Sequence, residues 1–454
     1  MIKRFLCVLC LLLVFSLSSG LASAEETKDA NAYAQFCEGR LFADELPEEA
    51  LPRPNRCIAS LEDFIYALDY LAFYRIGDAV YFDIDPSYAE TFFNPYTVFQ
   101  KAYQQSDLAD VYACHLEDSF YSSFRVVALK YSMSRDIASE PPEQIPDRAV
   151  IPSFDYVPSG DHELVIPIER SGKQPVPCEN GEQLYYLAMN GYRPVPREGS
   201  VAQTLYDAAC TVIRKRIRDD QSDFEKIKAV YDYLTSEVLY DRETAYSAET
   251  YLVREQAYYL EGVFLNHCAV CDGKAKAYAL LLNMLGIPCY RETGVSEYGD
   301  HAWNVVRLDG KWYVSCSTYG QSNVAALDRI LPNYATLLAG RETAYGDEWG
   351  YIPQKHPEIY AQLEETAYDV YGAMGAVDGL NLKVAALPEL TVLLDEIDGQ
   401  CVPEYKVELV YSGADSGEFQ EEMIQYLSSL PAVNAMEVKS EGGTVYQVIY
   451  LTEQ

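Results

Sequence analysis

The sequence predicts a multidomain α+β protein, and three observations support this prediction. The chain has 454 residues, which suffices for two to four domains at roughly 100–200 residues each. Hydrophobic residues make up 49% and charged residues 23%, as in globular proteins, so a mainly disordered chain is excluded. Segments with helical periodicity and segments with strand-like alternation both occur along the chain.

The charge balance excludes two classes of partner. The chain has 35 Lys and Arg against 69 Asp and Glu, which gives a net charge of −34. Nucleic acids and anionic membranes are bound through basic surfaces. We therefore expect no nucleic-acid partner.

The first 24 residues have the pattern of a signal peptide. Lys3 and Arg4 precede an apolar run over 5–17 that is too short to span a bilayer, and Ala22-Ser23-Ala24 is a small-residue cleavage site. No later segment has the length and hydropathy of a membrane helix. We expect a secreted or cell-surface protein without membrane insertion after signal cleavage.

The remaining chain divides by composition and periodicity. Ser60 is placed to cap a helix, and strand-like segments at 79–82 and 124–131 flank a second helix at 94–105. Near the C-terminus a helix at 418–430 precedes a strand at 444–450. The predicted domains are an N-terminal α+β domain at 25–138, a Pro-rich linker and lead-in at 139–199, a central domain at 200–325, a helical extension at 326–381 and a small α+β domain at 382–454.

Two helices are predicted in the central domain. Ser222 and Glu225 form a capping box, and apolar residues then recur every three or four positions. A second helix begins at Cys271 and ends at Gly286. The helix N-terminus carries partial positive charge and unpaired N–H groups, which favour a thiolate and can receive an oxyanion.

A β-hairpin follows the second helix. Asp309-Gly310 is a strong turn signal between strands at 301–308 and 311–316. With a two-residue turn, the numbers of opposed residues sum to 619, so His301 faces Thr318 and Trp303 faces Cys316. These four side chains share one face of the ribbon. Cys316 is then the diagonal neighbour of His301, roughly 7–8 Å away by backbone.

A Cys at a helix N-terminus, a His on a strand and an orienting residue on the next strand have the logic of a catalytic triad. Residues 222–320 resemble the transglutaminase-like superfamily, in the form found in secreted bacterial proteins. The matching stretches are 222–234, Val270-Cys271-Asp272-Gly273-Lys274-Ala275, His301-Ala302-Trp303-Asn304 and 309–313. The resemblance implies a papain-like fold with the Cys helix packed on an antiparallel sheet. It also implies thioester formation with an amide, followed by acyl transfer to an amine or to water.

The resemblance makes Cys271 the nucleophile and His301 the base, but the third position departs from the family. Cys316 replaces the family's Asp, and Gly273-Lys274 replaces the Gly-Tyr that often follows the nucleophile. A thiol is a weaker acceptor than a carboxylate. Three interpretations remain open: a poor orienter in a slow enzyme, an inactive site, or a redox lock in which Cys316 bonds to Cys271 or Cys268.

Cys268 and Cys271 form a C-x-x-C pair, which with Cys289, Cys316 or His301 is a possible zinc site. No second C-x-x-C accompanies it, and the family match already accounts for Cys271. We expect no metal and no cofactor, and a structural disulfide at Cys268.

The function expected from the sequence is that of a thiol acyl-transfer enzyme of peptidase or transglutaminase type. Its catalytic residues are Cys271, His301 and Cys316, and Trp303 forms either a substrate-binding wall of the cleft or part of the core. The partner is a peptide, a protein or a cell-wall substrate. The alternative is a catalytically impaired domain that binds a peptide or cell-wall fragment.

Overall fold

The computed structural model divides the chain into two compact units, Met1–Ser134 and Arg135–Gln454. The predicted signal peptide and the Pro-rich stretch at 139–160 lie outside the described residues, and the predicted domain boundaries stay predictions. The structure describes residues 41–42, 46, 50–89, 95–109, 114–120, 124–131, 166–170, 174–246, 255–296, 299–320, 334–346, 350–374, 383–384, 386–389, 391, 404–411, 416–429, 433–441 and 445–452.

Within these ranges, none of the helices combines the length and the hydropathy that a bilayer crossing requires.

The first unit is a mixed sheet with helices. Its strands run in the order β1-β3-β5-β4, with β2 also paired to β3, and its helix α2 begins at the predicted cap, where Ser60 Oγ accepts from the Asp63 N–H at 3.0 Å. Its elements are β1 (Leu41–Phe42), β2 (Cys57–Ile58), α2 (Leu61–Phe73), β3 (Val80–Ile84), α3 (Pro86–Ala89), α4 (Pro95–Gln105), β4 (Cys114–Phe120) and β5 (Phe124–Tyr131).

The second unit opens with helices and two short parallel strand pairs, β6 with β7 and β8 with β9. The predicted capping box is confirmed: Ser222 Oγ accepts from the Glu225 N–H, and the Glu225 carboxylate accepts from the Ser222 N–H at 2.7 Å. The elements are α5 (Pro167–Arg170), β6 (Pro175–Cys178), α6 (Gly181–Met189), β7 (Arg193–Pro196), α7 (Val201–Arg216), α8 (Asp223–Ser236), β8 (Leu239–Tyr240), α9 (Arg242–Tyr246), η3 (Glu255–Tyr258), α11 (Leu260–Phe264) and β9 (Cys268–Ala269).

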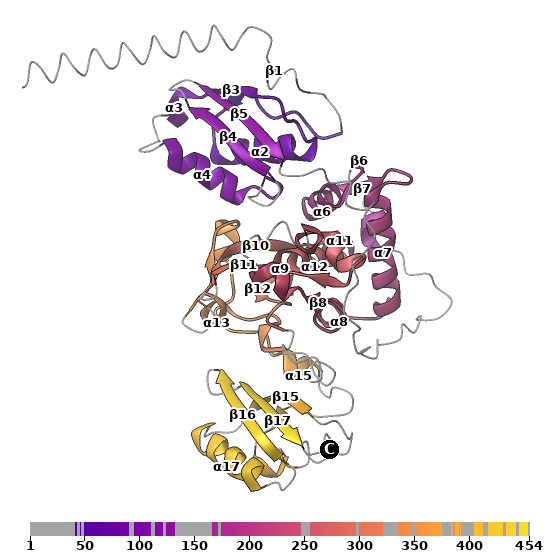
Figure 1. The fold of residues 1–454 in the computed structure, drawn as a ribbon, viewed down its shortest axis with the longest axis vertical. Coiled ribbons are helices and arrows are strands. Elements are labelled where there is room, and N and C mark those ends of the chain that lie inside the picture. Colours follow the sequence, from indigo (N-terminus) through magenta and orange to yellow (C-terminus); the bar gives the residue numbers. More distant parts are fainter. Residues whose placement is uncertain are drawn as a thin grey trace, which may run out of the picture. The chain divides into compact units, whose positions relative to one another are not determined.

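Helix α12 (Cys271–Met284) is the central element of this unit. It contacts α6, α8 and α11 as well as strands β10 (Cys289–Ser296) and β11 (Gly299–Leu308). Figure 1 shows α12 among these elements. Nearly all its side chains are buried. It ends at Met284, just before Gly286, the residue predicted to stop it, whose φ of 79° suits a residue without a Cβ. Its first residue, Cys271, is therefore held by packing on several sides.

The predicted hairpin register is confirmed over the paired part of the ribbon. Strand β11 pairs antiparallel with β12 (Lys311–Ser315), with Val305 opposite Val314 and Leu308 opposite Lys311. The ladder ends at Asn304 opposite Ser315, so the predicted pairings of Trp303 with Cys316 and of His301 with Thr318 do not form as strand pairs. Asp309 and Gly310 have φ angles of 51° and 82°, the two positive values of a type I′ turn. The sheet order is β12-β11-β10-β13.

The segment predicted as a helical extension also contains a strand. It is built from short elements, because glycines and prolines interrupt the helical pattern. Strand β13 adds to the edge of the sheet, with Gly294 opposite Pro353. The elements are η5 (Tyr334–Thr336), α13 (Arg341–Tyr345), β13 (Ile352–Pro353), α14 (Pro357–Tyr360) and α15 (Val370–Met374).

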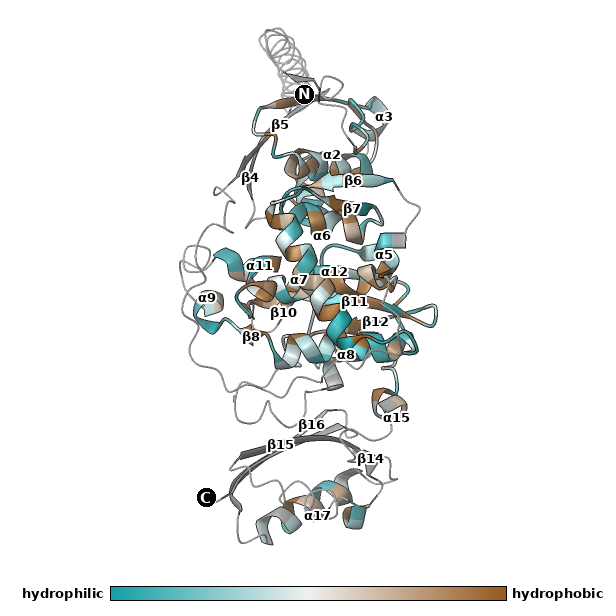
Figure 2. Ribbon diagram, turned by 90° about the vertical axis from the view of Figure 1, so that its right-hand side faces the viewer, coloured by the Kyte–Doolittle hydropathy of each residue, from teal (hydrophilic) through white to brown (hydrophobic). Residues whose placement is uncertain are grey.

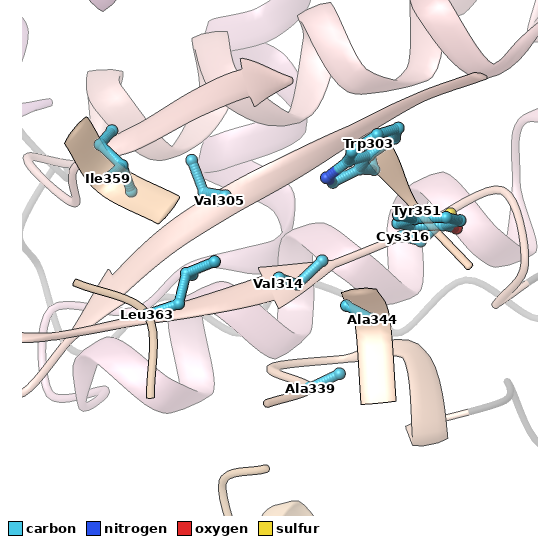
Figure 3. Close-up of a cluster of buried hydrophobic side chains, with 9 residues drawn as sticks. All are labelled: Trp303, Val305, Val314, Cys316, Ala339, Ala344, Tyr351, Ile359 and Leu363. Atoms are coloured by element: carbon cyan, nitrogen blue, oxygen red, sulfur yellow. The ribbon is translucent and has the colours of Figure 1, made fainter. Parts of the chain in front are cut away.

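This segment covers the face of β11 and β12 that carries Trp303 and Cys316. Figure 3 shows the resulting hydrophobic cluster, in which side chains from the two strands meet side chains from the segment. The cluster consists of Trp303, Val305, Val314, Cys316, Ala339, Ala344, Tyr351, Ile359 and Leu363.

A further sheet lies near the C-terminus, in the order β14-β15-β17-β16. The helix and the last strand occur where the sequence predicts them, whereas β16 was not predicted. In Figure 2 hydrophobic and hydrophilic residues alternate along the helix, α17, as in an amphipathic helix. The elements are β14 (Lys383–Val384), β15 (Glu404–Tyr411), α17 (Ser416–Ser429), β16 (Val433–Glu441) and β17 (Val445–Thr452).

The capping box gives a stability prediction. Ser222→Ala removes the acceptor for the Glu225 N–H, so we expect the free energy of unfolding to fall by about 1 kcal/mol. Chemical denaturation monitored by circular dichroism measures the change. Ser222→Thr keeps a capping hydroxyl and is the matched control; an equal loss in both variants would contradict the capping account.

Candidate active site

The Cys271 sulfur lies at the N-terminus of α12 and against strand β11. The side chain is partly exposed, and the sulfur hydrogen-bonds the backbone of Asp272 and of Ala302. Ala302 directly follows His301 along β11. The start of the helix and the start of the strand thus bring the predicted nucleophile beside the predicted base.

His301 is held in an aromatic setting and is only 8% exposed. Its ring stacks on Tyr319 with centroids 4.8 Å apart, and the rings of Tyr351 and Trp303 lie 5.4 Å and 5.9 Å away. Its Nε2 lies 3.3 Å from the sulfur of Cys316. Cys316 therefore occupies the position of an orienter, and Nδ1 is the ring nitrogen left for other partners.

The Cys316 sulfur is 1% exposed and is surrounded by hydrogen-bond donors. The Tyr319 N–H points to it at 3.5 Å, the Thr318 backbone also hydrogen-bonds it, and the Tyr351 hydroxyl lies close enough to lower its pKa. Figure 3 shows the Tyr351 ring beside Cys316. The chain turns back after β12 so that its own N–H groups converge on this sulfur.

Burial favours the neutral forms of both Cys271 and His301. Burial raises the pKa of the Cys271 thiol to about 12, the Asp272 carboxylate adds to the rise, and the two backbone hydrogen bonds oppose it. Burial lowers the pKa of His301 to about 4. The expected stabilisation of a thiolate by the helix N-terminus is thus outweighed in this site, because desolvation disfavours both charged forms.

A buried charge network fixes the first turn of α12. Asp272 pairs with Arg291 on β10 and with Lys276 Nζ at 3.0 Å. Lys276 also contacts Glu182 at 3.3 Å. The network ties the helix that begins at Cys271 to the neighbouring strand and to α6.

Lys274, where the family often has Tyr, is fully buried one turn after Cys271. Its Nζ donates to the Val238 carbonyl at 3.1 Å, and its charge acts on Cys316.

Sequence reasoning missed three tyrosines of the site. Tyr319 and Tyr351 enclose His301, and Tyr240 lies close enough to Cys271 and Cys316 for negative charge on them to raise its pKa, although burial is the larger cause. Tyr240 reaches this place because β8 pairs with β9 just before α12, with Tyr240 opposite Ala269. Nothing in the sequence separates these residues from the other tyrosines, of which the chain has 39 in total.

Trp303 belongs to the core and does not form a wall of an open cleft. It is 1% exposed, its ring stacks on Tyr351 with centroids 4.3 Å apart, and its Nε1–H donates to the Tyr345 hydroxyl at 3.0 Å. Of the two roles open from the sequence, the structure supports packing behind His301.

Cys268, Cys271 and Cys316 lie outside any disulfide in this structure. The disulfide expected at Cys268 is therefore not formed, and neither Cys271 nor Cys316 is part of a redox lock. Among the described residues, no group of three or more His, Cys, Asp or Glu side chains is arranged to hold a metal ion.

Comparison with known proteins identifies a transglutaminase-like domain. Residues 211–315 match the model of the Transglutaminase-like superfamily, a range that contains Cys271 and His301. The kyphoscoliosis peptidase of Mus musculus is 28% identical over 120 residues, and that of Homo sapiens 26%. Each match covers 24% of this chain and 17% of the relative, so the chain spans a small part of these curated relatives.

A solved transglutaminase structure is 16% identical, with a TM-score of 0.25 over 63% of this chain and 61% of that one. The chain is thus a mixed α+β protein that contains a transglutaminase-like domain.

The neutral, buried His301 makes stability depend on pH. The unfolded chain takes up a proton near the ordinary pKa of about 6.5, whereas folded His301 does so near 4. Between these values the unfolded state binds more protons, so the free energy of unfolding falls by about 3 kcal/mol as pH drops from about 6.5 to 4.

Denaturant titrations at several pH values test this prediction by comparing the free energy of unfolding of the wild type with that of His301→Asn. The variant loses this one titrating group and keeps all others. The advantage of the wild type over the variant should shrink as the pH falls through this window. Parallel stability curves for the two proteins would show that His301 is not buried in neutral form.

Proposed function

We propose that the transglutaminase-like domain has a papain-like arrangement and is a thiol acyl-transfer enzyme that hydrolyses amide bonds in peptides. One observation carries the proposal. The Cys271 sulfur at the start of α12 lies against the backbone of Ala302, the residue after His301. The Nε2 atom of His301 in turn contacts the Cys316 sulfur. Nucleophile, base and orienter thus follow one another in space as acyl transfer requires.

The reaction proceeds in two halves. His301 Nδ1 takes the proton of the Cys271 thiol while the sulfur attacks the amide carbonyl, so no resting ion pair is needed. The imidazolium then protonates the leaving amine, and a thioester remains on Cys271. A water molecule next loses a proton to His301 and attacks the thioester, which releases the acid and restores the thiol.

The developing oxyanion has two sources of stabilisation. The N–H groups of the first turn of α12 are available at Cys271 because they have no partners within the helix. The hydroxyl of Tyr240, on the strand that leads past the nucleophile, is the proposed side-chain donor.

A catalytically impaired binding domain is the second candidate, and one observation favours it. The thiol of Cys271 and the imidazole of His301 are both neutral at rest, with pKa values of about 12 and about 4. A site of this kind can hold a peptide or cell-wall fragment without cleaving it.

The proposal also covers the location of the enzyme and the class of its substrates. Residues 1–24 act as a signal peptide, and the mature protein acts outside the cell or at its surface on peptide, protein or cell-wall substrates. An aqueous environment supplies water as acyl acceptor, which favours hydrolysis over cross-linking. The acidic surface, with its net charge of −34, attracts cationic peptides.

Cys271→Ala is expected to abolish turnover of a fluorogenic peptide library, because no thioester can form. Cys268→Ala is the matched control, since it removes a neighbouring thiol outside the proposed machinery and should retain activity. Full activity in Cys271→Ala would refute the assignment of the nucleophile. A wild type that binds library peptides but cleaves none would support the binding domain.

Tyr240→Phe is expected to lower kcat by roughly 10²–10³-fold with little change in KM, because the lost hydroxyl serves the transition state. The control is Tyr246→Phe at the end of α9, where the side chain is 75% exposed. Steady-state kinetics on any cleaved library peptide measure both. A kcat for Tyr240→Phe equal to that of the control would remove Tyr240 from the oxyanion site.

A further inference from the structure

The surroundings of the Cys316 sulfur restrict where its hydrogen can point. The backbone groups of Thr318 and Tyr319 offer only N–H donors to it. Among the described residues, two neighbours can accept an S–H hydrogen: His301 Nε2, at 3.3 Å, and the hydroxyl of Tyr351. The imidazole nitrogen is the stronger base of the two. A neutral Cys316 therefore donates its hydrogen to Nε2.

The protonation of Cys316 thus decides the tautomer of His301. If the thiol donates to Nε2, the neutral imidazole carries its own proton on Nδ1. This is the nitrogen that has to accept the proton of Cys271, so His301 is blocked as a base. If Cys316 is a thiolate, it accepts from Nε2–H, and Nδ1 is left with a free lone pair. An aspartate at this position is ionised at neutral pH and always selects the second tautomer.

We propose that Cys316 is a positioning residue whose ionisation switches His301 from a tautomer that cannot deprotonate Cys271 to one that can. The inference rests on the proposed function and deepens it. One proton is lost in the switch: the off state carries S–H on Cys316 and N–H on Nδ1, and the on state carries only N–H on Nε2. The released proton goes to solvent.

The groups that face Cys316 from the packed elements set the pH of the switch. Lys274 and Cys271 face it from α12, Tyr240 from β8, His301 from β11, and Tyr319 and Tyr351 from the segments that follow β12.

Burial raises the pKa of the Cys316 thiol above its ordinary value, whereas the donors and the charge of Lys274 lower it. The thiolate, and with it the active tautomer, is therefore favoured as the pH becomes alkaline. Lys274 replaces the Tyr often found in the family, and it supplies a positive charge to a site whose orienter has lost its permanent negative charge.

The test is ¹⁵N NMR of protein labelled at histidine, because ring ¹⁵N shifts distinguish the two tautomers and the chain has only five histidines. The His301 signal is assigned by its loss in His301→Asn. In the wild type we expect Nδ1–H near neutral pH and a change to Nε2–H as the pH rises. Cys316→Asp should show Nε2–H across the whole range. A wild type that holds one tautomer throughout would overturn the inference.

Lys274→Met separates a charge effect from a packing effect. In the wild-type background it should move the tautomer change to higher pH, and in the Cys316→Asp background it should leave Nε2–H in place. An equal effect in both backgrounds would mean that Lys274 acts on packing alone. Tyr351→Phe is the second variant. It removes the alternative acceptor, so the change should persist with Nδ1–H as the tautomer at neutral pH.

Activity assays keep the inference and the proposed function apart. Hydrolysis at pH 7 should rise at least tenfold in Cys316→Asp, because the active tautomer is then populated without alkaline conditions. If the tautomer changes as expected but no variant cleaves peptides, the result supports the tautomer switch and refutes the proposed hydrolase activity. If the variants cleave peptides but the wild-type tautomer never changes, the result supports the hydrolase activity and refutes the switch.

Discussion

The contact between His301 Nε2 and the Cys316 sulfur is the interaction on which the account of the site depends. It exists because the Asp309-Gly310 turn sets the register of β11 and β12 and so brings residues 301 and 316 together across the ribbon. A shift of the pairing by one residue would move Cys316 to the other face of the sheet. The covering segment then closes this face with Tyr351 and its neighbours.

Burial gives the site its chemical character. The aromatic rings around His301 and the packing of α12 remove water from imidazole and thiols alike, so the neutral forms are favoured. The charged side chains near the site have different partners. The carboxylate of Asp272 pairs with Arg291 and Lys276, whereas the charge of Lys274 acts on Cys316. In the proposed enzyme, catalysis depends on which of these neutral groups carries each proton.

Local chemistry made several elements predictable from the sequence. The capping box at Ser222, the helix that begins at Cys271 and the hairpin around Asp309-Gly310 each follow from short-range rules, and together they place Cys271 near His301. Contacts over long sequence distances were not predictable. Tyr240 and Tyr351 reach the site through a parallel strand pair and a returning segment, and the burial of Trp303 depends on that same segment.

Alkylation of Cys271 by iodoacetamide in wild type and in His301→Asn tests the central claim most directly, because it reports whether the imidazole assists the thiol without requiring a substrate. Peptide mass spectrometry follows the label, with the exposed Cys57 as an internal reference thiol outside the site. The account predicts that Cys271 labels at least tenfold faster relative to Cys57 in the wild type than in the variant. Equal ratios at every pH would contradict a nucleophile and base acting as a pair.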